Sequence, residues 1–190
     1  MSNGTVLNIA AIARELGVDN KTVENYIRIL EDMMLAIRLP VFSKRAKRRL
    51  LKHEKFYFFD CGIFKTLRPL GPLDSIDEIT GISLEMLVLN ELRALNDYLA
   101  VGYKIFFWRT PLGNEVDFVL YGKSGFIAIE VKKAATLNHS DYAGLKTFLK
   151  DYPEAKGYIF YGGDRKNFHD KITIIPATEA LKNLRQIIAD

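Results

Sequence analysis

Residues 114–121 read NEVDFVLY and residues 126–132 read FIAIEVK, two apolar runs joined by a Gly-containing turn. Each run predicts a β-strand. In the second strand, alternation places Glu130 and Lys132 on the same face. Asp117 of the first strand lies among apolar residues, where an ionised carboxylate is unfavourable unless it is paired or binds a metal. If the two strands are neighbours, two carboxylates and an ammonium group converge, and such oxygen ligands suit Mg²⁺ or Mn²⁺.

The rest of the chain predicts an α/β protein with two domains. Residues 66–82 hold two prolines and two glycines with little periodicity, so we expect a linker there between a small domain, 1–65, and a larger one, 83–190. The larger domain is expected to be a mixed sheet flanked by helices. Its apolar patterns predict further strands at 103–109, 157–161 and 171–175, and helices at 83–99, 140–151 and 178–188.

Two short helices are predicted near the N-terminus, as in a helix-turn-helix. Asn8 is a typical N-cap for the first, which ends at Gly17. The second is expected from Lys21 to about Met34, with Met34 on its buried face and one of the two polar residues before it as the cap. Its outward side chains would face a DNA major groove: Lys21, Thr22, Asn25 and Arg28.

The runs at 35–42 and 55–59 predict the two strands of a wing, which gives a winged helix-turn-helix over residues 1–65. Basic side chains gather between these strands and would neutralise the phosphates of DNA or RNA: Lys44, Arg45, Lys47, Arg48, Arg49 and Lys52. The same stretch can be read as a solvated turn or as a protein-docking surface. All three interpretations stay open at this point.

Composition excludes several classes of protein. The 190 residues carry a formal net charge of +4 and a single cysteine, Cys61, so neither a disulfide framework nor a cysteine-rich zinc site is expected. The N-terminus lacks the pattern of a signal peptide, and charged residues interrupt every apolar run before it reaches membrane-spanning length. We therefore expect a cytoplasmic protein that does not interact with membranes.

The acids and the lysine resemble the motif of the PD-(D/E)XK, or restriction-endonuclease-like, superfamily. Its acid and Glu-x-Lys elements match Asp117 and Glu130-Val131-Lys132, and its usual helix glutamate matches Glu85 in GISLEMLVLNEL. The resemblance implies that Asp117 and Glu130 hold Mg²⁺ or Mn²⁺. It also implies that Lys132 orients or activates the attacking water and that Glu85 is a further ligand.

Glu91 is the alternative to Glu85 as the acid on the helix. Helical spacing places Glu91 nearer the middle of the leucine-rich stripe, so it is the acid expected to be more buried. It could belong to the site, or it could be a core carboxylate paired with an arginine such as Arg109.

A narrower resemblance extends over almost the whole chain. The stretches L7-N-I-A-A-I-A-R-E-L-G, K55-F-Y-F-F-D-C-G and G113-N-E-V-D-F-V-L are similar to the C-terminal region of a group of prokaryotic AAA+ family ATPases, in which a P-loop ATPase precedes a winged helix and a PD-(D/E)XK-like domain. No G-x-x-x-x-G-K-[ST] occurs in the chain, so these residues hold no ATP site. The implied function is a nucleic-acid-associated, divalent-metal-dependent, nuclease-like effector region of such an ATPase. The alternative is a catalytically silent interaction or regulatory module.

Overall fold

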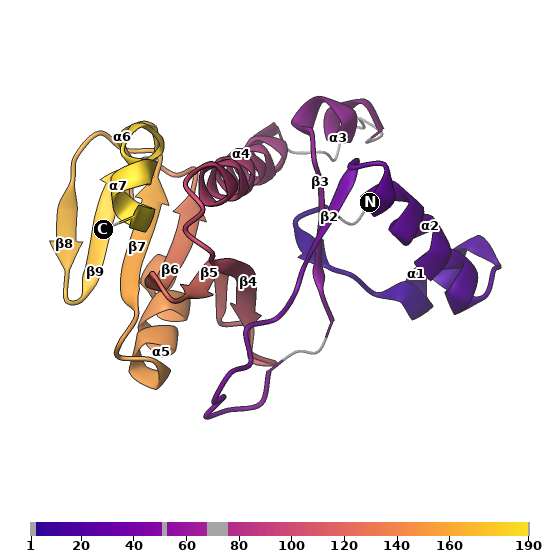
Figure 1. Ribbon diagram of the computed structural model, residues 1–190, viewed down its shortest axis with the longest axis horizontal. Helices are drawn as coiled ribbons and strands as arrows, with labels where there is room; N and C mark the ends of the chain where they lie inside the picture. The colour runs from indigo at the N-terminus through magenta and orange to yellow at the C-terminus, as the bar shows by residue number, and fades with distance from the viewer. Residues whose placement is uncertain (1–2, 51–52, 68–75, 190) are drawn as a thin grey trace. The chain divides into compact units, whose positions relative to one another are not determined.

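The computed structural model describes residues 3–50, 53–67 and 76–189. The chain divides into two compact units, coloured from indigo to yellow along the sequence in Figure 1. Unit 1 comprises Met1–Pro40 and Lys52–Met86, and unit 2 comprises Val41–Leu51 and Leu87–Asp190. Each unit therefore contains two separate stretches of the chain.

Unit 1 consists of short helices and a small antiparallel sheet. The strand order in this sheet is β1-β3-β2. Its elements are β1 (Thr5–Val6), α1 (Ile9–Leu16), α2 (Asn20–Asp32), β2 (Ala36–Leu39), β3 (Lys55–Phe58) and α3 (Cys61–Leu67). The predicted pair of helices and pair of strands is present, and the sequence did not predict α3.

The ends of α1 and α2 follow from local capping. Asn8 accepts a hydrogen bond from the N–H of Ala11 at 3.0 Å, and Asp19 accepts one from the N–H of Thr22 at 2.8 Å. Gly17 ends α1 in the left-handed conformation, with φ 67°. Met34 has φ 58° and is exposed in the turn after α2, so the prediction that it lies on the buried face is wrong.

The helix pair is tied to the sheet of unit 1 by one arginine. Arg38 of β2 forms ion pairs with Glu24 and Glu31 of α2 and with Glu54 beside β3, at 2.6 Å from Glu31 and 3.4 Å from Glu54. These carboxylates raise the pKa of the guanidinium group above its usual range through hydrogen bonds that outweigh its partial burial. This network fixes α2 against the ribbon of β2 and β3.

Unit 2 is built on a six-stranded mixed sheet with strand order β4-β5-β6-β7-β9-β8. The pairs β4–β5, β5–β6 and β8–β9 are antiparallel, whereas β6–β7 and β7–β9 are parallel. Its strands are β4 (Lys104–Arg109), β5 (Glu115–Gly122), β6 (Gly125–Lys132), β7 (Lys156–Tyr161), β8 (Asn167–His169) and β9 (Ile172–Pro176). The mixed α/β class is as predicted.

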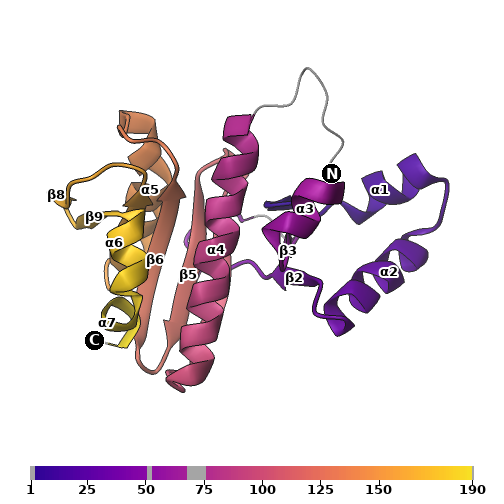
Figure 2. The ribbon, with the colours of Figure 1, turned by 90° about the horizontal axis from the view of Figure 1, so that it is seen from above.

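Helices cover both faces of this sheet. Figure 2 shows α4 (Ile76–Tyr98) and α6 (Ala177–Lys182) in front of the sheet and α5 (Ala143–Asp151) behind it. A short 3₁₀ helix, η1 (His139–Tyr142), leads into α5, and α7 (Leu184–Ala189) follows α6. A Cβ atom on Gly144 would lie 1.9 Å from the carbonyl oxygen of Glu115, so only glycine lets α5 approach β5 this closely.

The segment between β2 and β3 packs into unit 2, so the predicted cationic wing tip is wrong. Phe42 is buried, its N–H donates to the carbonyl of Phe107 at 2.7 Å, and its ring lies 5.2 Å from the ring of Phe126. Arg48 forms a two-pronged ion pair with the buried Asp151 at the end of α5, with one N–O distance of 2.6 Å. We call residues 41–50 the strap.

The domain boundaries also differ from those predicted. Helix α4 begins at Ile76, inside the predicted linker 66–82, and its residues are divided between the two units. Residues 68–75 of that linker, and Lys52 of the basic stretch, lie outside the described residues. No helix within 3–50, 53–67 and 76–189 combines the length and apolar composition needed to cross a bilayer.

Candidate active site

The candidate site begins at an irregularity in β5. Phe106 of β4 pairs with Val119, but Trp108, two residues later, pairs with Val116, three residues earlier. Strand β5 therefore contains one extra residue beside β4, and Asp117 lies within this bulge. A bulge bends the strand and changes the direction of a side chain, and bulges are frequent beside active sites.

Asp117 contacts β6 through its side chain. The pairing of β5 with β6 runs from Gly122↔Gly125 to Phe118↔Ile129, and just beyond it the Asp117 Oδ2 atom accepts the N–H of Val131 at 2.9 Å. Asp117 is 5% exposed, and the hydrogen bond from Val131 stabilises its carboxylate in this largely buried position. This contact holds Asp117 next to the residues on either side of Val131.

Those two residues are the other members of the predicted motif. Lys132 Nζ lies 2.7 Å from Glu130 Oε1, and Glu130 is 6% exposed. Burial alone would lower the pKa of Lys132, but the charges of Glu130 and Asp117, with a smaller contribution from Asp141, outweigh it and raise the pKa above its usual range. Lys132 is therefore an ammonium ion across the physiological pH range. The structure brings Asp117, Glu130 and Lys132 together.

Glu85 has its described contacts in unit 1. Its Oε2 atom accepts a hydrogen bond from the Tyr57 hydroxyl at 3.0 Å and lies 3.4 Å from Lys55 Nζ, both on β3. Lys55 is almost fully buried, which makes a carboxylate partner necessary. Sequence reasoning missed this lysine and tyrosine as partners of Glu85, although a lysine inside the apolar run KFYFF was a signal for a buried ion pair.

Glu91 is exposed on α4, so the prediction that it is the more buried acid is wrong. Its proposed partner Arg109 instead forms an ion pair with Glu115 at 3.1 Å. Leu87 of the same helix is also exposed, whereas Leu89 and Leu92 are fully buried. Apolar residues occur on nearly every side of this helix, so the sequence does not indicate which side faces the core.

The acid pair suits a divalent cation only with additional ligands. Asp117 and Glu130 supply hard carboxylate oxygens, the type that Mg²⁺ and Mn²⁺ prefer. Among the described residues, no group of three or more His, Cys, Asp or Glu side chains could hold a metal ion. A cation here would be bound by two carboxylates and completed by water or backbone oxygens, and Mg²⁺ typically keeps several waters. The residues present fit such a site.

The predicted DNA-reading residues of α2 have different surroundings. Arg28 is exposed and donates to Asn25 Oδ1 at 2.9 Å, and the Thr22 hydroxyl donates to Asp19 at 2.9 Å. Lys21 is exposed at the start of the helix. Three of the four predicted side chains, those of Thr22, Asn25 and Arg28, therefore make hydrogen bonds within the helix or to its N-cap.

Of the predicted phosphate-binding residues, all but Lys52 lie in the strap. Lys44, Arg45, Lys47, Arg48 and Arg49 are exposed as residues. Arg48 is bound to Asp151, and Lys44 Nζ lies 4.4 Å from the centre of the Tyr121 ring. Two of the five cations therefore stabilise the strap on unit 2, while Arg45, Lys47 and Arg49 present their charge at the surface.

Comparison with known families places the acid pair in a recognised domain. Residues 80–180, just over half of the chain, match the family described as Domain of unknown function (DUF4143). The chain belongs to the DUF4143 family. Residues 1–74 match a second family, Domain of unknown function (DUF8612). Asp117, Glu130 and Lys132 all lie within the DUF4143 match.

Relatives of this DUF4143 chain include two curated proteins. They are an uncharacterized protein of Mycobacterium bovis and an uncharacterized protein of Mycobacterium tuberculosis, each 25% identical over 182 residues. The aligned region covers 94% of the DUF4143 chain and 40% of each relative, so the chain spans about two fifths of their length. No solved structure matches the chain.

Proposed function

We propose that this chain is a nucleic-acid-associated, divalent-metal-dependent, nuclease-like effector region of an AAA+ type ATPase. The observation that carries the proposal is the convergence of Asp117, Glu130 and Lys132 beside the bulge in β5. The resemblance to the PD-(D/E)XK motif and to the C-terminal region of AAA+ ATPases supports it. Relatives more than twice as long as this chain leave room for an ATPase outside it.

Each residue of the trio has a defined part in phosphodiester hydrolysis. Asp117 and Glu130 would hold the cation, which lowers the pKa of bound water and neutralises charge on the phosphate. Water attacks phosphorus, the bond to the leaving oxygen breaks, and the products are a phosphate monoester and a hydroxyl. Lys132, which is charged, would orient the phosphate oxygens and stabilise the negative charge that develops on them.

A cleavage assay tests the proposal directly. Purified chain is incubated with single-stranded DNA, double-stranded DNA or RNA in Mg²⁺ or Mn²⁺, with EDTA as the control. We expect cleavage that is lost in Asp117→Asn, because the amide can still contact Val131 while the metal-binding charge is removed. Glu91→Gln is the matched control, since Glu91 is exposed on α4 and its variant should cleave normally. Cleavage that survives both Asp117→Asn and Lys132→Ala would indicate a contaminating nuclease.

A second candidate function is protein docking by unit 1, which the surface of α2 favours. Tyr26 and Ile29 of this helix and Met33 directly after it are exposed, at 66%, 48% and 61%. A helix that reads a major groove presents polar side chains to base edges, whereas exposed apolar side chains are typical of a protein contact. The partner that this candidate function implies is an ATPase region outside this chain, as the resemblance to AAA+ ATPases suggests.

A hollow beside the same helix adds to this surface. It has a volume of about 440 Å³ and a largely apolar lining that includes Leu7, Ile12, Leu16 and Phe56 with Tyr26.

DNA affinity measured for Arg28→Ala and Tyr26→Ala separates the two functions of unit 1. Loss of affinity in Arg28→Ala favours a DNA-reading helix, and unchanged affinity in both variants favours protein docking.

A further inference from the structure

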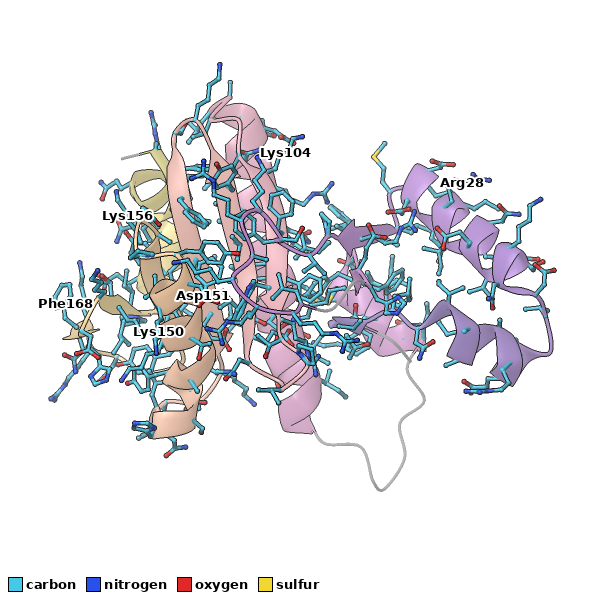
Figure 3. All side chains as sticks on the ribbon, turned by 90° about the horizontal axis from the view of Figure 1, so that it is seen from below. Arg28, Lys104, Lys150, Asp151, Lys156 and Phe168 are labelled. Carbon is cyan, nitrogen blue, oxygen red and sulfur yellow. The ribbon has the colours of Figure 1, made fainter. Side chains whose placement is uncertain are left out.

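The edge strand β8 carries an exposed aromatic ring among lysines. Phe168, at the centre of this strand, is 68% exposed, and Lys166 Nζ lies 5.8 Å from the centre of its ring. Strand β8 is the last in the order of the sheet, opposite the β4 edge. In Figure 3, Phe168 projects at one side of unit 2, with Lys156 nearby and Lys104 at the other edge.

A hollow of about 280 Å³ adjoins this ring. Lys156 and Tyr158 of β7 line it together with Lys166, Phe168 and Gln186 of α7. The volume is close to the lower limit of about 300 Å³ that is typical of ligand pockets. Among the described residues that line the hollow, none is acidic, so its charge favours an anion.

The pairing of the strands places the two aromatic side chains on one face. Thr173 of β9 pairs with Phe168 on one side and with Tyr158 on the other. Side chains at paired positions of neighbouring strands point to the same face of the sheet. Phe168 and Tyr158 therefore flank the hollow, and their rings supply flat apolar surface beside two cationic groups.

The loop before β8 has a fixed conformation. The Tyr161 hydroxyl donates to the carbonyl of Arg165 at 2.7 Å and accepts its N–H at 3.1 Å. Gly162 packs so closely on the preceding segment that a Cβ atom would lie 1.9 Å from the carbonyl oxygen of Lys133. A loop held at both ends loses little conformational entropy when Lys166 binds a ligand.

Further cations lie on the opposite face of the same edge. A second hollow, of about 420 Å³, is lined by Lys146 and Lys150 of α5 and by Asp170 and Lys171 in the turn between β8 and β9. Lys146 forms an ion pair with Asp170 at 3.4 Å, which leaves a net positive charge on the lining. Both faces of the β8 edge thus favour an extended polyanion.

We propose that the β8 edge, defined by Lys156, Tyr158, Lys166 and Phe168, binds single-stranded nucleic acid. A base stacks on the Phe168 ring, and neighbouring phosphates contact Lys156 and Lys166. Base stacking on an exposed aromatic side chain, combined with cations along the backbone, is the general basis of single-strand binding. This inference rests on the proposed function only in taking nucleic acid as the ligand, and it specifies the strandedness.

The edge is separate from the acid pair. Lys156 begins β7 and pairs with Ile127, whereas Glu130 and Lys132 pair with Ile159 and Tyr161 toward the end of β7. Three residues along a strand correspond to about 10 Å. The β8 edge therefore holds a strand at a distance from the acid pair, and binding can be measured without cleavage.

Fluorescence anisotropy of the full chain tests the inference, with labelled oligothymidylate and a labelled duplex as probes, in EDTA. Phe168→Ala should weaken single-strand binding by about fivefold or more, because stacking contributes about 1–3 kcal/mol per base. Duplex affinity should not change, since paired bases cannot stack on the ring. Tyr98→Ala, which removes an exposed ring from α4, is the matched control and should bind normally.

A salt titration tests the lysines. The slope of the logarithm of single-strand affinity against the logarithm of salt concentration is about −0.7 per phosphate contact. Replacing both Lys156 and Lys166 with Ala should therefore make this slope shallower by about 1.4. Lys104→Ala is the control at the β4 edge and should change neither slope nor affinity. Circular dichroism of every variant confirms that the fold is intact.

Several outcomes would overturn the inference. One is the absence of single-strand binding at low salt. Another is an equal loss of single-strand affinity in Phe168→Ala and Tyr98→Ala. A third is competition by polyglutamate that is as strong as competition by oligothymidylate. Cleavage without a Phe168 effect would refute the β8 edge and leave the proposed nuclease function intact. Phe168-dependent binding without cleavage would support the β8 edge and count against the nuclease.

Discussion

At the scale of single residues, the ion pair between Lys132 and Glu130 determines which chemistry the site can perform. The Glu130 and Asp117 carboxylates outweigh the effect of burial and raise the pKa of the Lys132 ammonium group above its usual range, which favours a cation over a base that takes a proton from water. In its charged form Lys132 orients and stabilises a phosphate group. Of the two roles that the motif resemblance implies for Lys132, orienting or activating the attacking water, a positive charge favours orientation.

Substitution of Lys132 distinguishes a cation from a base. We expect Lys132→Arg to retain cleavage, because arginine keeps the charge but cannot lose a proton. Lys132→Gln should lose about 10²-fold or more, as is typical when one group that stabilises a developing charge is removed. Single-turnover cleavage rates measure both. If Lys132→Arg is as inactive as Lys132→Gln, the cation role is wrong.

Loss of the same charge should also lower stability. Lys132→Met leaves the buried Glu130 carboxylate without its cation, which we expect to lower the free energy of unfolding by about 2–3 kcal/mol. Breaking a fully buried ion pair costs about 3–5 kcal/mol, and the cost is smaller here because Lys132 is partly exposed. Adding Glu130→Gln to this variant should restore most of the loss. Urea unfolding measures each free energy.

The pH dependence of that difference has a definite sign. The folded-state pKa of Lys132 is raised, so its contribution to stability is complete below the unfolded pKa of about 10.4 and declines as the pH rises through the higher folded value. The stability gap between the wild type and Lys132→Met should therefore not decline as the pH rises from 7 to about 9. A gap that shrinks within that range would contradict the raised pKa.

At the scale of elements, the strap is a segment whose packing partners could not be predicted from local sequence patterns. The pattern of residues 35–42 and 55–59 predicted two paired strands, and β2 and β3 are paired. Nothing local predicted that the residues between them would pack on a distant sheet, because the partners of Phe42 and Arg48 come from the second half of the chain. A run of basic residues usually indicates a solvent-exposed segment, but in this run Arg48 is bound to Asp151.

The strap gives a prediction that contrasts two adjacent arginines. Arg48→Ala should destabilise the protein by about 2–3 kcal/mol, because the buried Asp151 carboxylate loses its partner. Arg49→Ala removes the same charge from an exposed position and should stay within about 0.5 kcal/mol of the wild type. Urea unfolding of both variants provides the measurement. Equal destabilisation would show that the ion pair with Asp151 contributes nothing specific.

The helix caps, the buried face of α4 and the strand β8 also differ in how far local sequence predicts them. The cap Asn8 was predicted, and Asp19 was one of two candidate caps, Asp19 or Asn20, because capping depends on a few adjacent residues. The buried face of α4 was assigned wrongly because its apolar residues surround the helix and only tertiary packing selects a side. The edge strand β8 was missed since it has three residues and an exposed centre.

The candidate site was partly readable from the sequence for a comparable reason. Alternation in FIAIEVK placed Glu130 and Lys132 on one face, and their ion pair follows from it. The bulge that directs Asp117 toward Val131, and the hydrogen bond of Glu85 with Tyr57, depend on register and packing and have no local signature.

At the scale of the whole molecule, the family boundary and the physical boundary differ. The DUF4143 match begins at residue 80, but unit 2 includes residues 41–51. A fragment cut at the family boundary therefore lacks the strap and exposes the apolar surface that Phe42 covers. Removal of one buried phenylalanine side chain alone typically costs about 3–5 kcal/mol.

Truncation tests this division. We expect a fragment of residues 80–190 to unfold at lower urea concentration than the same region within the full chain, and a peptide of residues 41–50 added in trans to raise its midpoint. The same peptide with Phe42→Ala is the control and should have little effect. Equal midpoints for the fragment and the full chain would show that the strap is not part of the folded unit.

The central claim, that Asp117 and Glu130 form a divalent-cation site, is tested most directly by crystals of the full chain grown with Mn²⁺. We predict one anomalous density peak within coordination distance of both carboxylates, and its loss in crystals of Asp117→Asn. Ordered Asp117 and Glu130 side chains without anomalous density between them, at a Mn²⁺ concentration that saturates other carboxylate sites, would contradict the claim.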